Sequence, residues 1–374
     1  MAIVIRTVQN HRDLMTFIKM PLRLYAGNQF WLPPLFADEL QTLSRRKNPA
    51  FDFCEAEYFL AYRDGQLVGR IAALINHHAI EKWGKEYGRF GWVEFIEDFE
   101  VAKALFEAAQ AWLKTKGMKG IQGPMGFTDL DKEGLLIEGF QEMGTMPMIY
   151  NHPYYPEYIE RLGFTKDVDW LEYEVKVPSE IPAKVTRVQK IIAERTGIHV
   201  HEWKTTRELK TKFAKQIFSL IDEAYAGLYG TTALTEKQVD MYIDMYLGFA
   251  DPRFMKLVVD KDERLIALGL AMPSFSNALQ KARGRILPFG WFHLLRAFKK
   301  PTGIDLYLVA VRPEHKALGT VAFLMTALIT SCREAGVVSA ETSGELETNI
   351  EVQSLWKGYE RRQHKRRRAY VKEL

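Results

Sequence analysis

The sequence has few cysteines and no long apolar run. Cys54 and Cys332 are the only cysteines in 374 residues. Cys332 falls on the apolar face of an expected helix, which argues against a disulfide and favours a reducing compartment. Two cysteines without histidines at matching spacing also argue against a structural zinc site. No apolar run reaches the roughly 18 residues of a transmembrane helix, and charges interrupt the first residues too early for a signal peptide. We therefore expect a cytoplasmic protein.

The chain has the composition of a globular protein. Apolar residues make up 47% of it and charged residues 26%, and the net charge is only +4. Its length is sufficient for two domains with complete cores. The charge is unevenly distributed, because residues 361–372 carry seven lysines and arginines and no acid.

The most informative stretch runs from residue 304 to residue 334. It begins with an almost continuously apolar segment, which is typical of a strand covered on both faces. Pro313 ends this strand, and a short loop with Gly319 follows. A helix is predicted to begin at Thr320, which is placed to cap it, and to end at Gly336. The first turn of a helix has unpaired N–H groups and a partial positive charge. The stretch therefore indicates either an anion site or an ordinary strand-to-helix turn.

The letters V-R-P-E-H-K-A-L-G-T-V around this loop resemble the acetyl-CoA pyrophosphate loop of the GNAT (Gcn5-related N-acetyltransferase) superfamily. Lys316 stands where Arg or Gln is usual, Gly319 matches, and Val321 replaces the last small residue. The resemblance implies acetyl-CoA or another acyl-CoA as co-substrate, with no metal, and a strand N–H that polarises the thioester carbonyl. The cofactor-binding residues that it implies are Val309, Val311, His315, Lys316, Leu318, Gly319, Thr320, Val321 and Asn349.

The order of predicted elements occurs twice. Hairpin, strand, helix, strand, helix and strand are predicted in each half of the chain, with an insertion at residues 274–300 in the second. We expect the fold class α/β (α+β), with two tandem GNAT-like domains at residues 1–178 and 183–374, each a mixed central sheet flanked by helices. This layout resembles mycothiol synthase, the Fem peptidyltransferases and N-myristoyltransferase. The alternative is that any two α/β halves would share this order.

The first half carries acids where the phosphate loop belongs. Residues 94–100 hold Glu94, Glu97, Asp98 and Glu100 and no glycine. Carboxylates repel phosphate groups. We therefore expect the first domain to be a degenerate copy and the second to bind CoA.

Candidate catalytic residues follow the second phosphate loop. Glu341, Glu345 and Glu347 fall on one side if the strand continues, and an amine acceptor needs a base because its ammonium form is not nucleophilic. A solvated strand end is the alternative for these acids. By the resemblance, a tyrosine near residue 356 protonates the departing thiolate, but the chain has Trp356 there. Tyr359 lies on the same helical face and is the candidate acid.

Candidate acceptor residues lie in loops rich in turn residues and aromatics. In the first half these are Asp129, Asp131, His152 and Tyr155, since loops at strand ends often form pockets. In the second half, Tyr225 and Tyr229 follow a helix in a region where the resemblance implies acceptor contacts.

Two further segments have more than one interpretation. The basic run at residues 361–368 is typical of a β-hairpin turn; nucleic-acid binding is disfavoured, because no aromatic residue interrupts the run for stacking. The basic, amphipathic segment 281–300 suits peripheral contact with a bilayer surface, a cover for a long acyl chain, or packing between the domains.

The sequence thus predicts an acyl-CoA-dependent N-acyltransferase, with acetyl as the default of the family it resembles. The acyl group would pass directly to the amine of a small molecule, a peptide or a lipid. One alternative is a GNAT-like protein that binds acyl-CoA or lipid without turnover. A further alternative is a nucleic-acid-binding module that uses the basic tail.

Overall fold

In the part of the chain that the structure describes, fourteen strands form a single mixed sheet. The computed structural model describes residues 2–374, apart from the side chains of residues 246 and 249. The first half contributes β1 (Ile3–Thr7), α1 (His11–Lys19), α2 (Pro21–Leu24), α3 (Phe36–Leu43), β2 (Cys54–Arg63), β3 (Gln66–Asn76), α4 (His77–Trp83), β4 (Tyr87–Phe95), α5 (Phe99–Thr115), β5 (Gly120–Gly123), β6 (Leu135–Glu138), α6 (Tyr154–Arg161) and β7 (Thr165–Lys176). These elements follow the predicted order.

The second half repeats this order with an insertion. It contains α7 (Ala183–Thr196), β8 (His199–His201), α8 (Thr206–Glu208), α9 (Ala214–Tyr225), α10 (Glu236–Tyr246), β9 (Met255–Val259), β10 (Leu265–Pro273), α11 (Ser276–Ala282), α12 (Gly290–Lys299), β11 (Gly303–Val311), the short 3₁₀ helix η4 (Pro313–Leu318), α13 (Thr320–Ala335), β12 (Ser339–Thr342), β13 (Glu345–Leu346), α14 (Ile350–Ser354) and β14 (Arg361–Glu373). The expected mixed α/β architecture is confirmed.

Local sequence chemistry explains the most regular parts. The β2–β3 hairpin turns at Asp64 and Gly65, both with positive φ (51° and 76°), as the Asp-Gly signal predicts. Asp98 caps α5 by accepting from the backbone N–H of Glu100 at 3.0 Å. Helix α13 begins at Thr320 and ends at Gly336, as expected, but its N-cap is Gly319 and not Thr320. The Thr320 hydroxyl donates instead to the carbonyl of His315 at 2.8 Å.

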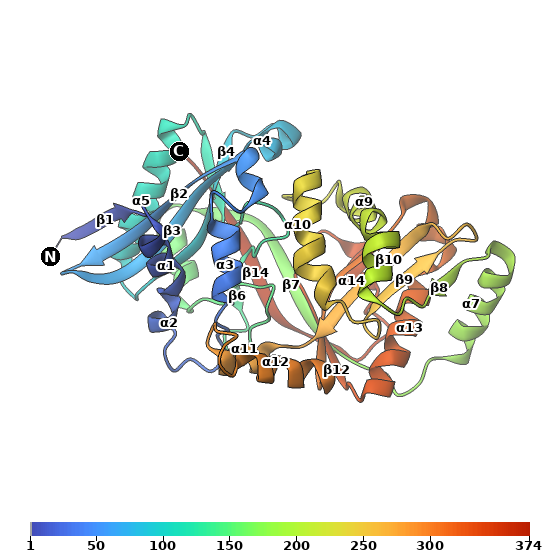
Figure 1. Cartoon of the computed structure of the whole chain (residues 1–374). Coiled ribbons are helices and arrows are strands. Elements are labelled where there is room, and N and C mark those ends of the chain that lie inside the picture. The colour runs from blue at the N-terminus through green and yellow to red at the C-terminus, as the bar shows by residue number, and fades with distance from the viewer. Residues whose placement is uncertain (1) are drawn as a thin grey trace.

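The two halves exchange strands at the centre of the sheet. The strand order is β1-β2-β3-β4-β5-β14-β7-β12-β11-β10-β9-β8. The last strand of the chain, β14, therefore pairs with β5 and β7, and the last strand of the first half, β7, pairs with β12. Figure 1 shows β14 in red and β7 in green side by side between the two halves. The division into domains at residues 1–178 and 183–374 stays a prediction. The two parts share this continuous sheet.

The prediction of a basic hairpin turn at residues 361–368 was wrong, because this run is the inner strand β14. Its long cations face acids of neighbouring elements: Arg368 Nε lies 2.8 Å from Asp169 Oδ1, and Arg362 Nη1 lies 2.6 Å from Glu142 Oε1. Lys365 and Arg367 are each only 1% exposed. A run of positive charge is thereby neutralised inside the sheet.

Each half has its own apolar core on the shared sheet. In the first half, α5 and α6 pack on β2, β3 and β4, with Phe90, Phe95 and Phe106 at the centre. In the second half, α9 packs on one face of β9, β10 and β11, while α13 covers their other face. Among the described helices, none combines the length and hydropathy needed to cross a bilayer.

Candidate functional site

A cavity of about 280 Å³ lies where the two halves meet. The first half contributes the loop around Asp129 and Glu133 and the segment Pro147–Met148. The second half contributes α9, the middle of β11, the segment from Thr342 to Leu346, and residues of α13 and α14. Most of the wall is apolar, with a few acids and tyrosines among leucines, which is the usual make-up of a small-molecule site.

The cavity opens where two parallel strands separate. β11 and β12 are paired from Gly303↔Ser339 to Leu306↔Thr342. Beyond this point the chain turns at Gly344, and β13 pairs with β7. The Ser343 hydroxyl bridges the start of the opening by donating to the carbonyl of Tyr307 at 2.8 Å. The second half of β11 thus borders an opening in the sheet that we call the slot, which is part of the cavity.

An irregularity in β11 lies at the same place. Leu270 of β10 is paired with Leu308, but the next residue, Ala271, is paired with Leu306, so Tyr307 is an extra residue in the ladder. Such a bulge changes the direction of the backbone and frequently occurs beside active sites. The slot passes through the sheet at this bulge, because its lining includes Leu324 of α13 on one face and Tyr225 of α9 on the other.

Glu345 brings a carboxylate into this slot. Its side chain is buried, and Oε1 accepts from the indole N–H of Trp356 at 2.5 Å. Oε2 has no hydrogen-bond partner among the described residues. Burial raises the pKa of Glu345 to about 7, although the Trp356 hydrogen bond acts in the opposite direction. The carboxyl can therefore exchange a proton near neutral pH.

The first half adds more acids through the loop after β5. Asp131 folds this loop by accepting from the backbone N–H of Phe127 at 2.8 Å. Asp129 Oδ1 and Glu133 Oε2 are buried atoms without a hydrogen-bond partner among the described residues, and both side chains line the cavity. Burial raises the pKa of Glu133, and the nearby Asp129 raises it further. Sequence reasoning missed Glu133, because nothing local distinguishes it from a solvated loop acid.

A buried arginine ties the loops of the two halves together. Arg89 of β4 is 1% exposed. It donates to the carbonyl of Gly126 at 3.0 Å and to that of Gly230 at 3.3 Å. The loop that carries Asp129 and the loop after Tyr229 are therefore held against each other across the cavity.

The two tyrosines expected from the second half both lie in the cavity wall. The Tyr225 hydroxyl donates to the carbonyl of Val309 at 2.8 Å, and Tyr229 donates to Asp167. Burial raises the pKa of both phenols, so both stay neutral. The predicted site residues that the structure brings together here are Asp129, Asp131, Tyr225, Tyr229, Val309, Glu345 and Asn349.

The expected phosphate loop lies beyond the cavity, at the start of α13. Gly319 has φ 69° and leaves the first turn of α13 without a side-chain cap. Lys316 Nζ lies 2.7 Å from Glu351 Oε2 of α14, and Leu318 is 39% exposed. Val311 and Val321 pack in the core with Phe323. The cavity lining reaches α13 at Leu324, and His315 to Val321 lie outside it.

The corresponding helix start in the first half is occupied by the protein itself. Asp98 accepts from the first N–H groups of α5 and pairs with Arg63 at 2.5 Å. Glu94 is buried and accepts from the Tyr155 hydroxyl at 2.9 Å. A carboxylate thus fills the position that is uncapped at Gly319.

The three candidate glutamates do not share one face, so that expectation was wrong. The turn at Gly344 separates them. Glu341 faces β14, where it pairs with Lys365. Glu347 pairs with Lys166 at 2.7 Å. Only Glu345 lines the cavity.

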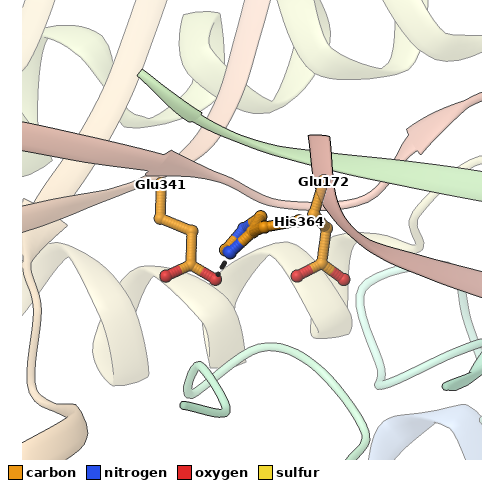
Figure 2. Close-up of side chains that lie close together, drawn as sticks. All are labelled: Glu172, Glu341 and His364. Carbon is orange, nitrogen blue, oxygen red and sulfur yellow. Dashed lines mark ion pairs between the residues drawn. The ribbon is translucent and has the colours of Figure 1, made fainter. Parts of the chain in front are cut away.

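Glu341 belongs to a buried polar cluster. Figure 2 shows Glu172, Glu341 and His364 pointing toward one another, with His364 Nε2 at 3.3 Å from Glu341 Oε1. One ligating atom of each lies within 4.8 Å of the others, a spacing that suits a metal ion. Lys365 Nζ, however, pairs with Glu341 and lies 3.6 Å from Glu172 Oε2. The lysine already supplies positive charge to both carboxylates.

Three other candidates lie away from the cavity. Tyr155 is fully buried in the first core, and His152 stacks on Tyr25 with ring centroids 4.7 Å apart. Tyr359 packs beside Trp356 at 6.3 Å between ring centroids. Their sequence signals, a loop rich in aromatics and a helical spacing, do not say which way a side chain points.

Comparison with known proteins gives both sequence relatives and structural neighbours. No family model matches the chain. Protein YghO of Escherichia coli is 30% identical over 99% of this chain and 95% of its own length. A protein described as a bacterial ceramide synthase, from Caulobacter vibrioides, is 28% identical over 78% of this chain and 75% of its own.

Solved structures match at the level of the fold. A tandem GNAT protein from the clavulanic acid biosynthesis pathway covers 100% of this chain and 98% of its own, at 12% identity and TM-score 0.57. A GCN5-related N-acetyltransferase from Sphaerobacter thermophilus covers 99% and 95%, at 12% identity and TM-score 0.50. This chain therefore belongs to the same family as protein YghO, and its fold is that of tandem GNAT proteins.

Proposed function

We propose that this protein is an acyl-CoA-dependent N-acyltransferase. The observation that carries the proposal is the slot between β11 and β13, which passes through the sheet and holds the buried carboxyl of Glu345. A thioester entering from the α13 face and an amine entering from the α9 face would meet inside the sheet, away from bulk water.

The donor is assigned to the second half of the chain. There the uncapped first turn of α13 offers N–H groups to a pyrophosphate, with Lys316 beside it. In the first half the equivalent N–H groups are taken by Asp98. We accordingly keep the division into residues 1–178 and 183–374, with CoA on the second part and the first supplying acceptor contacts.

The reaction proposed is direct transfer. The acceptor ammonium first loses a proton to Glu345. The free amine then attacks the thioester carbonyl, the C–S bond breaks, CoA leaves as a thiolate, and the second proton of the nitrogen replaces the one that Tyr359 gives to the thiolate. Glu345 suits this role because its pKa of about 7 allows it to be ionised before the reaction and protonated after it. Tyr359 remains the proposed acid for the thiolate, although it lies outside the cavity wall.

The cavity suits an amine with an apolar body. Asp129, Glu133 and Glu345 offer oxygen atoms to an ammonium and to hydroxyl groups. Leu130, Leu228 and Trp170 supply apolar wall around them. A ceramide is the fatty amide of a long-chain amino alcohol, and one relative is described as a ceramide synthase. We therefore propose a lipid amine as acceptor and place long-chain acyl-CoA beside acetyl-CoA among the candidate donors.

The test combines binding and turnover. Acetyl-CoA and palmitoyl-CoA are titrated by calorimetry into the wild type and Gly319→Glu, and thiol release is then followed with sphinganine as acceptor. Gly319→Glu should abolish binding. Gly336→Glu is the matched control, since its φ of 75° imposes similar backbone strain at the other end of α13, in open space. Failure of the wild type to bind either thioester would overturn the proposal.

A second candidate function is binding of acyl-CoA without turnover. It is favoured by Trp356, which occupies the position of the usual tyrosine and gives its N–H to Glu345. Tight thioester binding without thiol release, across short-chain and long-chain amines, would support it.

A further inference from the structure

The strongest concentration of exposed apolar side chains lies in one short part of the insertion. Leu287 and Phe289 are 72% and 73% exposed, and Trp291 and Phe292 are 48% and 52% exposed. Ile286 and Leu295 are exposed as well. Large apolar side chains gathered in this way mark a contact surface, because scattered single ones are the rule elsewhere on a protein. We call residues 281–300 the α11–α12 patch.

Positive charge surrounds these apolar residues. Lys281, Arg283, Arg285, Arg296, Lys299 and Lys300 are all exposed. The sequence contains no acid between Glu263 and Asp305. A protein partner with an apolar face would not require so many cations, whereas the headgroup layer of an anionic membrane requires both features together.

The patch is held firmly on the protein. The inner side of α12 packs through Leu294, Ala297 and Phe298 on a cluster centred on Leu32, Phe275 and Leu279. Arg253 donates to the carbonyl of Phe298 at 2.8 Å. The exposed side chains therefore belong to a helix pair that is anchored on the protein. The alternative prediction, that this segment packs between the domains, holds for its inner face only.

The patch also adjoins the cavity. Met143 and Met146 pack against the inner side of α11 and α12, and the next residues along the chain, Pro147 and Met148, line the cavity. Figure 1 shows α11 and α12 in orange along one edge of the molecule, beside the strands where the two halves meet. A surface bound to this edge would lie next to the cavity wall.

We propose that the α11–α12 patch docks on the surface of an anionic lipid bilayer, with Leu287, Phe289 and Phe292 inserted at the headgroup boundary. This surface is independent of acyl transfer, so it would stand even if the chain had no transferase activity.

The test is sedimentation of the full chain with vesicles. Vesicles of phosphatidylcholine with about one third phosphatidylglycerol should pull the protein down, whereas pure phosphatidylcholine should do so weakly. Binding should fall steeply between 50 mM and 500 mM salt, because charge screening removes the attraction. The tryptophan emission should shift to the blue on binding in the wild type but not in Trp291→Phe, as a check that this region is buried.

Variants separate the apolar and the charged contributions. Phe289→Glu with Phe292→Glu should lower the vesicle affinity at least tenfold, and Arg283→Gln with Arg285→Gln should lower it about fivefold or more per charge. Val338→Glu is the matched control, because Val338 is equally exposed (70%) and lies outside the patch. Melting temperatures verify that each variant is folded.

Two results would overturn the proposal. One is equal sedimentation of the Phe289→Glu, Phe292→Glu variant and the wild type. The other is a dimer of the wild type in solution that the same variant dissociates, since the patch would then be covered by a second copy of the chain.

Discussion

Glu345 is the residue on which the proposed chemistry depends most. Glu345→Gln keeps the size of the side chain and the contact with Trp356 but removes the base. We expect kcat/KM to fall about 10²–10⁴-fold. The wild-type rate should rise with pH up to about 7, where the carboxyl ionises, and then level off. The variant should lack this limb and rise only at more alkaline pH, where the free amine forms.

The comparison that isolates this effect is Glu347→Gln. Glu347 forms an ion pair with Lys166 away from the cavity, so its loss should leave the pH profile intact. An unchanged profile in Glu345→Gln would remove this carboxyl from the mechanism.

Single residues show which parts of the candidate site could be predicted from the sequence. Alternation along a strand placed Glu341, Glu345 and Glu347 together, because the turn at Gly344 was not recognised. Gly344 packs where its Cβ would lie 3.1 Å from the Cβ of Trp170, a long-range contact that local pattern does not contain. Tyr225 and Tyr229 were found because the resemblance to GNAT proteins implies acceptor contacts in that region of the chain.

At the scale of elements, β14 is paired with its neighbours by charge as well as by its backbone. Lys365 is 1% exposed and faces Glu172 and Glu341. Replacing it in Lys365→Met leaves two carboxylates in a buried site with less positive charge. We expect a loss of about 3–5 kcal/mol in the free energy of unfolding, measured by urea denaturation.

Lys176→Met provides the control for that experiment. Lys176 pairs with Glu360 at the solvent-exposed end of β7, with both side chains more than half exposed. Its loss should cost about 0–1 kcal/mol. A similar loss of unfolding free energy in both variants would show that the burial of the Lys365 ion pairs does not contribute to stability.

The elements themselves were largely predictable, and β14 shows where prediction ended. Hairpins, helix ends and capping residues depend on neighbours in sequence, and they were found. The run of basic residues in β14 looked like an exposed turn because several of the acids that pair with it lie far away in the sequence, as in the pair of Arg362 with Glu174 of β7, 188 residues earlier. Charge pattern alone does not show such a partner.

At the scale of the whole molecule, the continuous sheet joins the two halves into one cooperative unit. Each half lacks a complete inner sheet unless the other supplies a strand. We expect a single unfolding transition by calorimetry, with equal calorimetric and van't Hoff enthalpies. Two separate transitions, one assigned to residues 1–178 by limited proteolysis, would contradict this expectation.

The duplication was visible in the sequence from the repeated order of elements, whereas the exchange of strands was not. Both arrangements, exchanged and unexchanged, satisfy the same hydrophobic pattern. The choice depends on pairings such as Arg368 with Asp169, which join the last strand of the second half, β14, to the last strand of the first half, β7.

The position of β14 also determines when the sheet can be completed during synthesis in the cell. The strand that lies between β5 and β7 is β14, which is synthesised after all the other strands of the sheet that the structure describes. During synthesis the edges of β5 and β7 that face β14 therefore remain unpaired. Such unpaired edges promote association with other chains. The nascent protein depends on being shielded until β14 has been synthesised, and a chain truncated before β14 neither folds nor stays dispersed.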